Sequence, residues 1–193
     1  MKARALFASI LLLFASPLLG LGRDLGIAGR EAPSWESLEW LNLPEDLAPL
    51  DVASFRGKVL YIFCFQSWCP GCHSHGFPTL QEVERHYAGN EDVHFVAVQT
   101  VFEGYGSNTE QRALDDLADY GLEIPLAHDS GEGRGASPFM RAYRTGGTPW
   151  TVIVGPDGRV AWNGFSLKPG AAIRMVDELL PAPPADPAAD AGP

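Results

Sequence analysis

Residues 59–72 read VLYIFCFQSWCPGC, an apolar run followed almost at once by two cysteines in C-x-x-C spacing. The run 59–66 predicts a buried strand, and residues 69–87 are compatible with a helix. This order places Cys69 at a helix N-terminus, where unpaired backbone N–H groups and the helix dipole stabilise a thiolate. Because the thiolate is the form that attacks disulfides, the pattern predicts a redox centre made of Cys69 and Cys72.

The same two cysteines have two other interpretations, a structural disulfide and half of a zinc site. A structural zinc usually needs two such pairs or well-spaced histidines, and Cys64 is the only other cysteine of the chain. Cys64 lies within the predicted strand, where a small buried hydrophobic residue is the simplest role and a resolving thiol is the alternative. We therefore interpret the C-x-x-C pair as redox-active.

The rest of the sequence alternates between strand and helix patterns. Further strands are expected at 93–100, 124–127, 150–154 and 159–163, and further helices at 109–120, 137–143 and 171–180. A Pro-Asp-Gly turn joins the last two strands as a hairpin. Residues 32–51 hold two tryptophans among prolines and acids, and we expect them to form a packed N-terminal extension. This order predicts the α/β class, with a mixed sheet and helices on both of its faces.

Four motifs together resemble proteins of the thioredoxin fold: FRGKV at 55–59, WCPGC at 68–72, GTPW at 147–150 and GPDG at 155–158. The sequence is similar to the extracytoplasmic TlpA/ResA-like thiol-disulfide oxidoreductases, also called redoxins, over about residues 33–180. The resemblance implies a thioredoxin-like fold, in which a central mixed β-sheet is flanked by helices, here with an N-terminal extension. It also implies a protein thiol-disulfide oxidoreductase that requires no bound cofactor.

The resemblance assigns the second half of the site to Thr148 and Pro149. Thioredoxin-like folds place a cis-proline opposite the C-x-x-C pair, so Pro149 is expected to be cis. The alternative is an ordinary trans proline that opens a strand. In the cis arrangement Thr148 presents its backbone to an extended substrate peptide. Trp68, which directly precedes the first cysteine, is the third expected substrate-binding residue.

The chain departs from the family pattern at the groups that handle protons. Thioredoxins carry a buried aspartate six residues before the first cysteine, where this chain has Phe63. ResA-like proteins use a glutamate three residues after the second cysteine, where this chain has His75. Pro78 also falls one residue later than the family's helix-kinking proline, which indicates a local insertion. His73 and His75 are therefore the candidates for proton transfer, since imidazole titrates near about 6.5; the alternative is that both face solvent.

The loop at 99–109 follows the end of a predicted strand, the edge at which open α/β sheets place their binding loops. Its glycines and aromatics suit a position near the active site. A plain surface loop ahead of an Asn/Thr-capped helix explains the same residues equally well. The sequence leaves both interpretations open.

The leading hypothesis for function is exchange of a C-x-x-C dithiol with disulfides of protein substrates, more as a reductant than as an oxidant. Cys69 attacks and Cys72 resolves the mixed disulfide, and a membrane donor supplies the electrons. The alternative is a copper-binding protein of the same fold, in which Cys69, Cys72 and a histidine hold the metal. Copper-delivery members use a longer Cys-x-x-x-Cys spacing, and His128 is the only remote histidine that suits. A peroxide reductase is a weaker option, because the expected Thr-x-x-Cys pattern is missing.

The N-terminus indicates the compartment. Lys2 and Arg4 precede an uncharged run at 5–22, the pattern of an export signal. The run is long for a signal peptide and near the lower limit of a membrane span, so residues 1–22 are either a signal peptide or a membrane anchor. The basic end should stay in the cytoplasm, which leaves the domain outside, in the bacterial periplasm.

Composition fits one exported globular domain. The net charge is −10, and residues 1–22 hold two basic residues and no acid, so the remainder carries −12. A chain this acidic is not expected to bind nucleic acid. We expect the thioredoxin-like domain with its extension at 23–180. A disordered Pro/Ala-rich tail is expected at 181–193.

Overall fold

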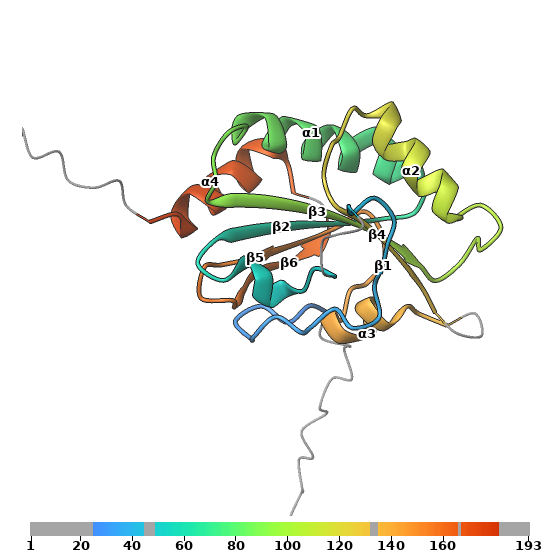
Figure 1. Cartoon of the computed structure of the whole chain (residues 1–193), viewed down its shortest axis with the longest axis horizontal. Helices are drawn as coiled ribbons and strands as arrows, with labels where there is room; N and C mark the ends of the chain where they lie inside the picture. Colours follow the sequence, from blue (N-terminus) through green and yellow to red (C-terminus); the bar gives the residue numbers. More distant parts are fainter. Residues whose placement is uncertain (1–24, 45–48, 132–134, 166, 182–193) are drawn as a thin grey trace, which may run out of the picture.

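The computed structural model describes residues 25–44, 49–131, 135–165 and 167–181, which form a six-stranded sheet with helices on both faces (Figure 1). The strands are β1 (Glu39–Trp40), β2 (Val59–Phe65), β3 (Val93–Val101), β4 (Leu126–Ser130), β5 (Trp150–Val154) and β6 (Val160–Phe165). The helices are the 3₁₀-helix η1 (Val52–Phe55), the π-helix η2 (Cys72–Gly76), α1 (Phe77–His86), α2 (Glu110–Asp119), α3 (Pro138–Tyr143) and α4 (Pro169–Leu179). The expected segment 1–22 and all but the first residue of 181–193 lie outside the described residues. Among the described helices, none is long and apolar enough to cross a bilayer.

The sheet has the order β1-β4-β3-β2-β5-β6. Strand β3 pairs in parallel with both β2 and β4, whereas β5 is antiparallel to β2, β6 to β5, and β1 to β4. The predicted mixed sheet is therefore confirmed, with all five predicted strands and the hairpin in place. The two-residue strand β1, which lies inside the N-terminal extension, was not predicted.

Strand β2 lies in the middle of the molecule, and all seven of its residues are buried. A strand covered on both faces reads as a continuous apolar run because neither face meets water. Phe63 and Phe65 point into the layer that contains α1, α2 and α4. Ile62 and Cys64 point to the opposite layer, which contains α3 and the N-terminal segment. Figure 1 shows these two layers on either side of the sheet.

The helix that follows β2 contains a π turn. The helical backbone begins at Pro70, widens into η2 and continues as α1. The Phe77 N–H donates to the Cys72 carbonyl, five residues back, which is the hydrogen bond that defines a π-helix. A π turn absorbs one extra residue without ending the helix. It therefore accounts for the insertion that the position of Pro78 indicates.

The π turn brings the backbone of Gly76 very close to its neighbours. A Cβ atom at this position would lie 2.7 Å from the Phe63 ring and 2.9 Å from the Cβ atom of Pro149. Only glycine leaves room for such an approach. The helix is therefore seated directly on β2 and on the segment before β5.

The N-terminal extension packs against the face of the sheet that α3 covers. Trp35 is 3% exposed, and its Nε1–H donates to the Tyr143 hydroxyl at 2.9 Å. The Tyr143 hydroxyl donates in turn to the Pro33 carbonyl at 2.8 Å, and the Trp35 N–H donates to Asp51 at 2.7 Å. These bonds tie the extension to α3 and to the N-cap of η1, so the expectation of a packed extension is confirmed.

A stability comparison of two tryptophans tests this packing. Trp35→Ala should lower the free energy of unfolding by about 3–5 kcal/mol, because it removes a buried indole and its hydrogen bond. Trp68→Ala is the matched control and should cost roughly 1 kcal/mol or less, since Trp68 is 44% exposed. Urea denaturation followed by far-UV circular dichroism measures both. Equal losses for the two variants would contradict a structural role of the extension.

Candidate functional site

The two cysteines of the motif lie at the start of the helix as free thiols. Cys69 directly precedes the first helical residue, and the Cys72 N–H donates to its sulfur at 3.2 Å. A backbone N–H that points at a sulfur favours the thiolate. Cys69 keeps 6% of its surface exposed and Cys72 none, so Cys69 is the more accessible thiol and Cys72 lies deeper, as expected.

The environment of Cys72 keeps it a thiol. Burial raises the pKa of Cys72, and a hydrogen bond with Cys69 raises it further. The Gln66 backbone and the Thr148 side chain form hydrogen bonds that lower it in part. Cys72 must therefore lose a proton to a base before its sulfur can react.

The segment before β5 lies against the start of the helix. The Thr148–Pro149 peptide bond is cis, as expected. A Cβ atom on Gly71 would lie 3.2 Å from Cδ of Pro149, so the proline ring rests on the turn between the two cysteines. Together with the hydrogen bond from Thr148 to Cys72, this contact brings the two expected halves of the site together.

Trp68 directly precedes Cys69, and its side chain is partly exposed to solvent. Its Nε1–H donates to the Gln66 side chain at 3.2 Å. The backbone of Gly104, which has φ of +59°, approaches so closely that a Cβ atom there would lie 2.8 Å from the indole. The loop after β3 therefore borders the active site, and its Thr109 also caps α2. The loop therefore lies beside Trp68, as the first interpretation predicted, and the helix cap is present as well.

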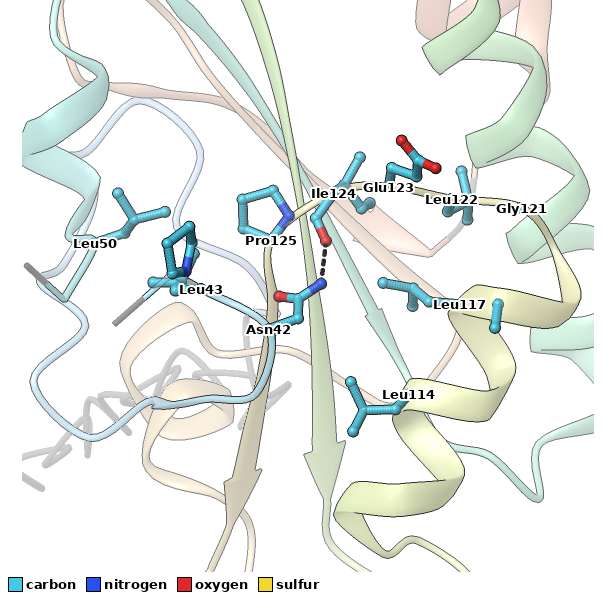
Figure 2. A pocket seen from close by; sticks show the side chains of 12 residues that line it. Asn42, Leu43, Leu50, Leu114, Leu117, Gly121, Leu122, Glu123, Ile124 and Pro125 are labelled. Carbon is cyan, nitrogen blue, oxygen red and sulfur yellow. Dashed lines mark hydrogen bonds between the residues drawn. The ribbon is translucent and has the colours of Figure 1, made fainter. Parts of the chain in front are cut away.

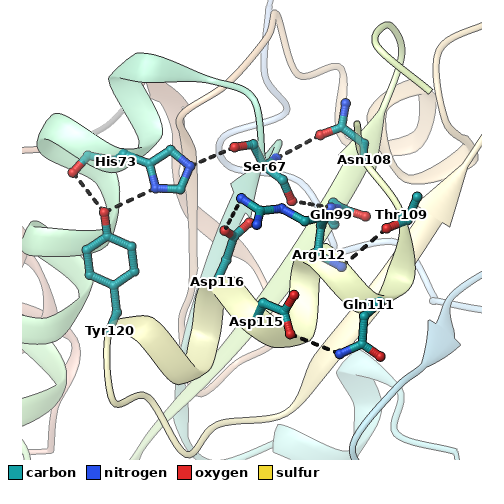
Figure 3. A network of polar contacts seen from close by, with 10 residues as sticks. All are labelled: Ser67, His73, Gln99, Asn108, Thr109, Gln111, Arg112, Asp115, Asp116 and Tyr120. Atoms are coloured by element: carbon teal, nitrogen blue, oxygen red, sulfur yellow. Dashed lines mark hydrogen bonds and ion pairs between the residues drawn. The ribbon is translucent and has the colours of Figure 1, made fainter. Parts of the chain in front are cut away.

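The two candidate histidines face different surroundings, because residues two apart do not share a helix face. His73 Nε2 donates to the Ser67 carbonyl at 2.7 Å, and His73 Nδ1 lies 3.1 Å from the Tyr120 hydroxyl (Figure 3). The carbonyl can only accept, so the proton of the neutral ring is on Nε2. His75 is exposed and has no such contacts among the described residues. His73 is therefore the histidine built into the site.

A buried polar network that no sequence pattern predicted supports the turn between β2 and the helix. The Ser67 N–H donates to Asn108 at 2.7 Å, and the Gln99 amide donates to the Ser67 hydroxyl at 2.7 Å. Nδ1 of His128 lies 2.6 Å from the side-chain oxygen of Gln99. These residues come from the turn after β2, from β3, from β4 and from the loop before α2, so only the folded chain brings them together. The Asn-Thr pair at 108–109 was the one visible signal, and it indicated a helix cap.

An apolar groove of about 530 Å³ runs beside Pro149. Its lining includes His75 and Phe165, and Phe165 is 55% exposed. A second cavity of about 650 Å³ lies between α2 and the N-terminal extension, with Asn42 donating to the Ile124 carbonyl at its edge (Figure 2). None of the described residues lining this second cavity belongs to the C-x-x-C segment. Of the two, the groove at Pro149 is the one that reaches the C-x-x-C segment, through Gly71.

The residues named for the copper alternative are not gathered into one group. Cys64, which is the alternative resolving thiol and not a candidate copper ligand, is buried on the opposite face of the sheet from Cys69 and Cys72, and burial raises its pKa. His128 is buried on β4 and engaged by Gln99. In the described part of the chain, no group of three or more His, Cys, Asp or Glu side chains could hold a metal ion. Nothing in this geometry favours the copper alternative.

Comparisons with known proteins agree with this geometry. A family model described as Redoxin matches residues 27–170. A solved thioredoxin-like superfamily protein shares 27% identity with a TM-score of 0.70, over 79% of this chain and 99% of that one. A thiol-disulfide isomerase from Corynebacterium glutamicum shares 28% identity with a TM-score of 0.66, over 79% and 98%. A putative thiol:disulfide interchange protein DsbE from Chlorobium tepidum shares 21% identity with a TM-score of 0.57, over 81% and 97%.

Among curated proteins no sequence matches this chain. The structural matches confirm the predicted thioredoxin-like fold.

The different burial of the thiols predicts an order of alkylation. In the reduced protein, iodoacetamide should modify Cys69 first, because it is the accessible thiol and carries an N–H donor at its sulfur. Cys72 and Cys64 should react only slowly, since burial raises the pKa of each. Mass spectrometry of the quenched reaction measures the order, and Cys69→Ser should remove the fast phase. Faster modification of Cys72 than of Cys69 would contradict the assignment.

Proposed function

The chain belongs to the redoxin family and is a protein thiol-disulfide oxidoreductase, and from this premise we propose that it acts outside the cytoplasm as a reductant of protein disulfides. The observation that carries the proposal is the pairing of an accessible sulfur with a buried thiol. The Cys72 N–H points at Cys69, while Cys72 itself is fully buried. This arrangement suits Cys69 to attack the substrate disulfide and Cys72 to resolve the mixed disulfide.

The reaction follows from these two environments. The Cys69 thiolate attacks one sulfur of a substrate disulfide, and the released substrate sulfur takes up a proton. Cys72 then gives its proton to a base and attacks the Cys69 sulfur. The bond between Cys69 and the substrate breaks, and the substrate leaves with two thiols. Two electrons have passed to the substrate, and the Cys69–Cys72 disulfide is reduced again by a dithiol donor in the membrane.

We assign the proton transfer to His73 and not to His75. His73 lies in the turn of the helix that follows Cys72, and its ring is held between Ser67 and Tyr120. His75 lies in the groove wall and is exposed. An imidazole ionises near the working pH, so it can take the Cys72 proton and later return it to solvent.

Trp68, Thr148 and Pro149 form the proposed docking surface. The Thr148 backbone next to the thiols suits pairing with an extended substrate segment. The groove beside Pro149, with the exposed ring of Phe165, offers an apolar seat for a side chain of that segment. These contacts support the proposal that the substrate is a protein disulfide and not a small thiol alone.

Export is supported by the sequence of residues 1–22, with its two basic residues ahead of an uncharged run. The structural neighbour from Chlorobium tepidum is described as a thiol:disulfide interchange protein. A periplasmic reductant needs electrons from outside that oxidising compartment, and a membrane donor meets this need. The segment is removed as a signal peptide or kept as an anchor.

Trapping the mixed disulfide tests the proposed function. Wild-type protein with dithiothreitol should reduce insulin, and both Cys69→Ser and Cys72→Ser should abolish this turnover. Only Cys72→Ser should accumulate a covalent complex with substrate proteins, because its first step remains while its second step is lost. Cys64→Ser is the matched control and should keep wild-type activity, since Cys64 faces the other layer. Complexes that form through Cys72 instead would contradict the roles assigned.

A topology-reporter fusion tests the location. Alkaline phosphatase joined after residue 181 should be active in a Gram-negative host, because the enzyme needs the oxidising periplasm. Deleting residues 1–22 should abolish that activity while the domain still folds. High activity of a cytoplasmic reporter at the same junction would contradict export.

A further inference from the structure

Asp116 is a buried carboxylate beside the redox site. It lies on α2 and is 1% exposed. Arg112, one turn earlier and itself half exposed, approaches its Oδ1 at 3.8 Å. Its Oδ2 has no hydrogen-bond partner among the described residues. Figure 3 shows the carboxyl directed from α2 toward the segment that holds Ser67 and His73.

A buried carboxylate with an unpartnered oxygen lowers the stability of the fold. Its presence therefore calls for a reason other than stability. Burial raises the pKa of Asp116. A hydrogen bond from Ser67 and the charges of His73 and Arg112 lower it, and Asp119 raises it. The neighbouring positions Ala113 and Leu117 are apolar core. An apolar residue at 116 would fit this core better, so the carboxylate indicates a functional role.

The contacts of His73 fit both of its protonation states. In the neutral ring, Nε2–H donates to Ser67 and Nδ1 accepts from the Tyr120 hydroxyl. When Nδ1 gains a proton it donates to the Tyr120 oxygen, and the hydroxyl turns to the His73 carbonyl, 3.2 Å away. No donor is left without an acceptor in either state. Asp116 places a carboxyl group close enough for the charge of His73 to act on it.

We propose that Asp116 and Tyr120 are positioning residues that hold His73 as the proton acceptor of Cys72. The two residues are one helical turn apart on α2 and so face the same helix start. In the resolving step the Cys72 S–H bond breaks, the proton passes to His73 Nδ1, and the new S–S bond to Cys69 displaces the substrate thiolate. This inference rests on the proposed function and adds the groups that set the strength of its base.

The groups around His73 determine which variants test the proposal. Nδ1 of His73 lies against the Tyr120 hydroxyl, and the charge of Asp116 acts on His73 from α2. Asp116 meets Arg112 and Asp119 from α2, and His73 from η2. In the resolving step the imidazole becomes positively charged, and Asp116→Asn removes the negative charge that acts on it. The resolving step should therefore be slower in this variant.

Stopped-flow reaction of the reduced full chain with 5,5′-dithiobis(2-nitrobenzoate) separates the two steps. The first thionitrobenzoate released reports attack by Cys69, and the second reports resolution by Cys72. Asp116→Asn should keep the first rate and lower the plateau of the second about tenfold, a part of the 10²–10⁴ that a general base contributes. His73→Gln should slow the second step at least as much while it keeps the first rate.

Matched controls come from neighbouring residues. Asp115→Asn changes a carboxylate that pairs with Gln111 away from the site, and it should leave both phases unchanged. An Asp116→Asn variant with a wild-type rate in the second phase would overturn the inference. If the wild-type protein shows neither phase and does not reduce insulin, the proposed function itself is overturned.

Stability separates a positioning role from a structural one. Because the pKa of Asp116 is raised in the folded protein, its ionised form becomes destabilising as the pH rises through that value. Asp116→Asn should therefore be at least as stable as the wild type at neutral pH. If Asp116→Asn does not fold, the inference of a destabilising carboxylate is wrong for Asp116. Tyr120→Phe then tests the other residue, and an unchanged second phase in that variant overturns the rest of the proposal.

Discussion

The redox site depends on one constraint, which is that the chain must pass from a fully buried strand into a helix within four residues, 66–69. The Cys69 N–H donates to the Gln66 carbonyl at 3.0 Å, and this turn sets both cysteines at the helix start. The strand cannot shift, because both of its faces are packed. The helix cannot shift either, since Gly76 lies against Phe63 and Pro149. The positions of the two sulfurs follow from these two contacts.

The turn itself is polar, although it lies inside an apolar core. The side chains of Gln66, Ser67, Gln99 and Asn108 are buried and hydrogen-bonded to one another. These hydrogen bonds rigidify the turn, while the Nε2 atom of Gln66 has no hydrogen-bond partner among the described residues. The network also joins the loop beside Trp68 to the end of β2, so the docking surface and the thiols are held by the same bonds.

Local patterns in the sequence predicted most of the fold and the central chemistry. The apolar run of β2, the C-x-x-C spacing and the Thr148–Pro149 pair each carry their signal within a few residues. The π turn was indicated only by the displaced Pro78. The role of Asp116 was not predictable, because α2 is an ordinary amphipathic helix in sequence and only tertiary packing brings this residue to His73. The bond between Trp35 and Tyr143 was hidden for the same reason, since 108 residues separate them.

In the proposed mechanism only Cys69 forms a bond with the substrate, and the substrate backbone pairs with Thr148. Proton transfer takes place at the buried Cys72. The most direct test is a crystal structure of Cys72→Ser joined by a disulfide to a cysteine-containing peptide. The account predicts a bond from Cys69, an extended peptide that pairs with the Thr148 backbone, and a peptide side chain in the groove beside Phe165. A peptide bound through another cysteine, or one that lies away from Thr148, would contradict it.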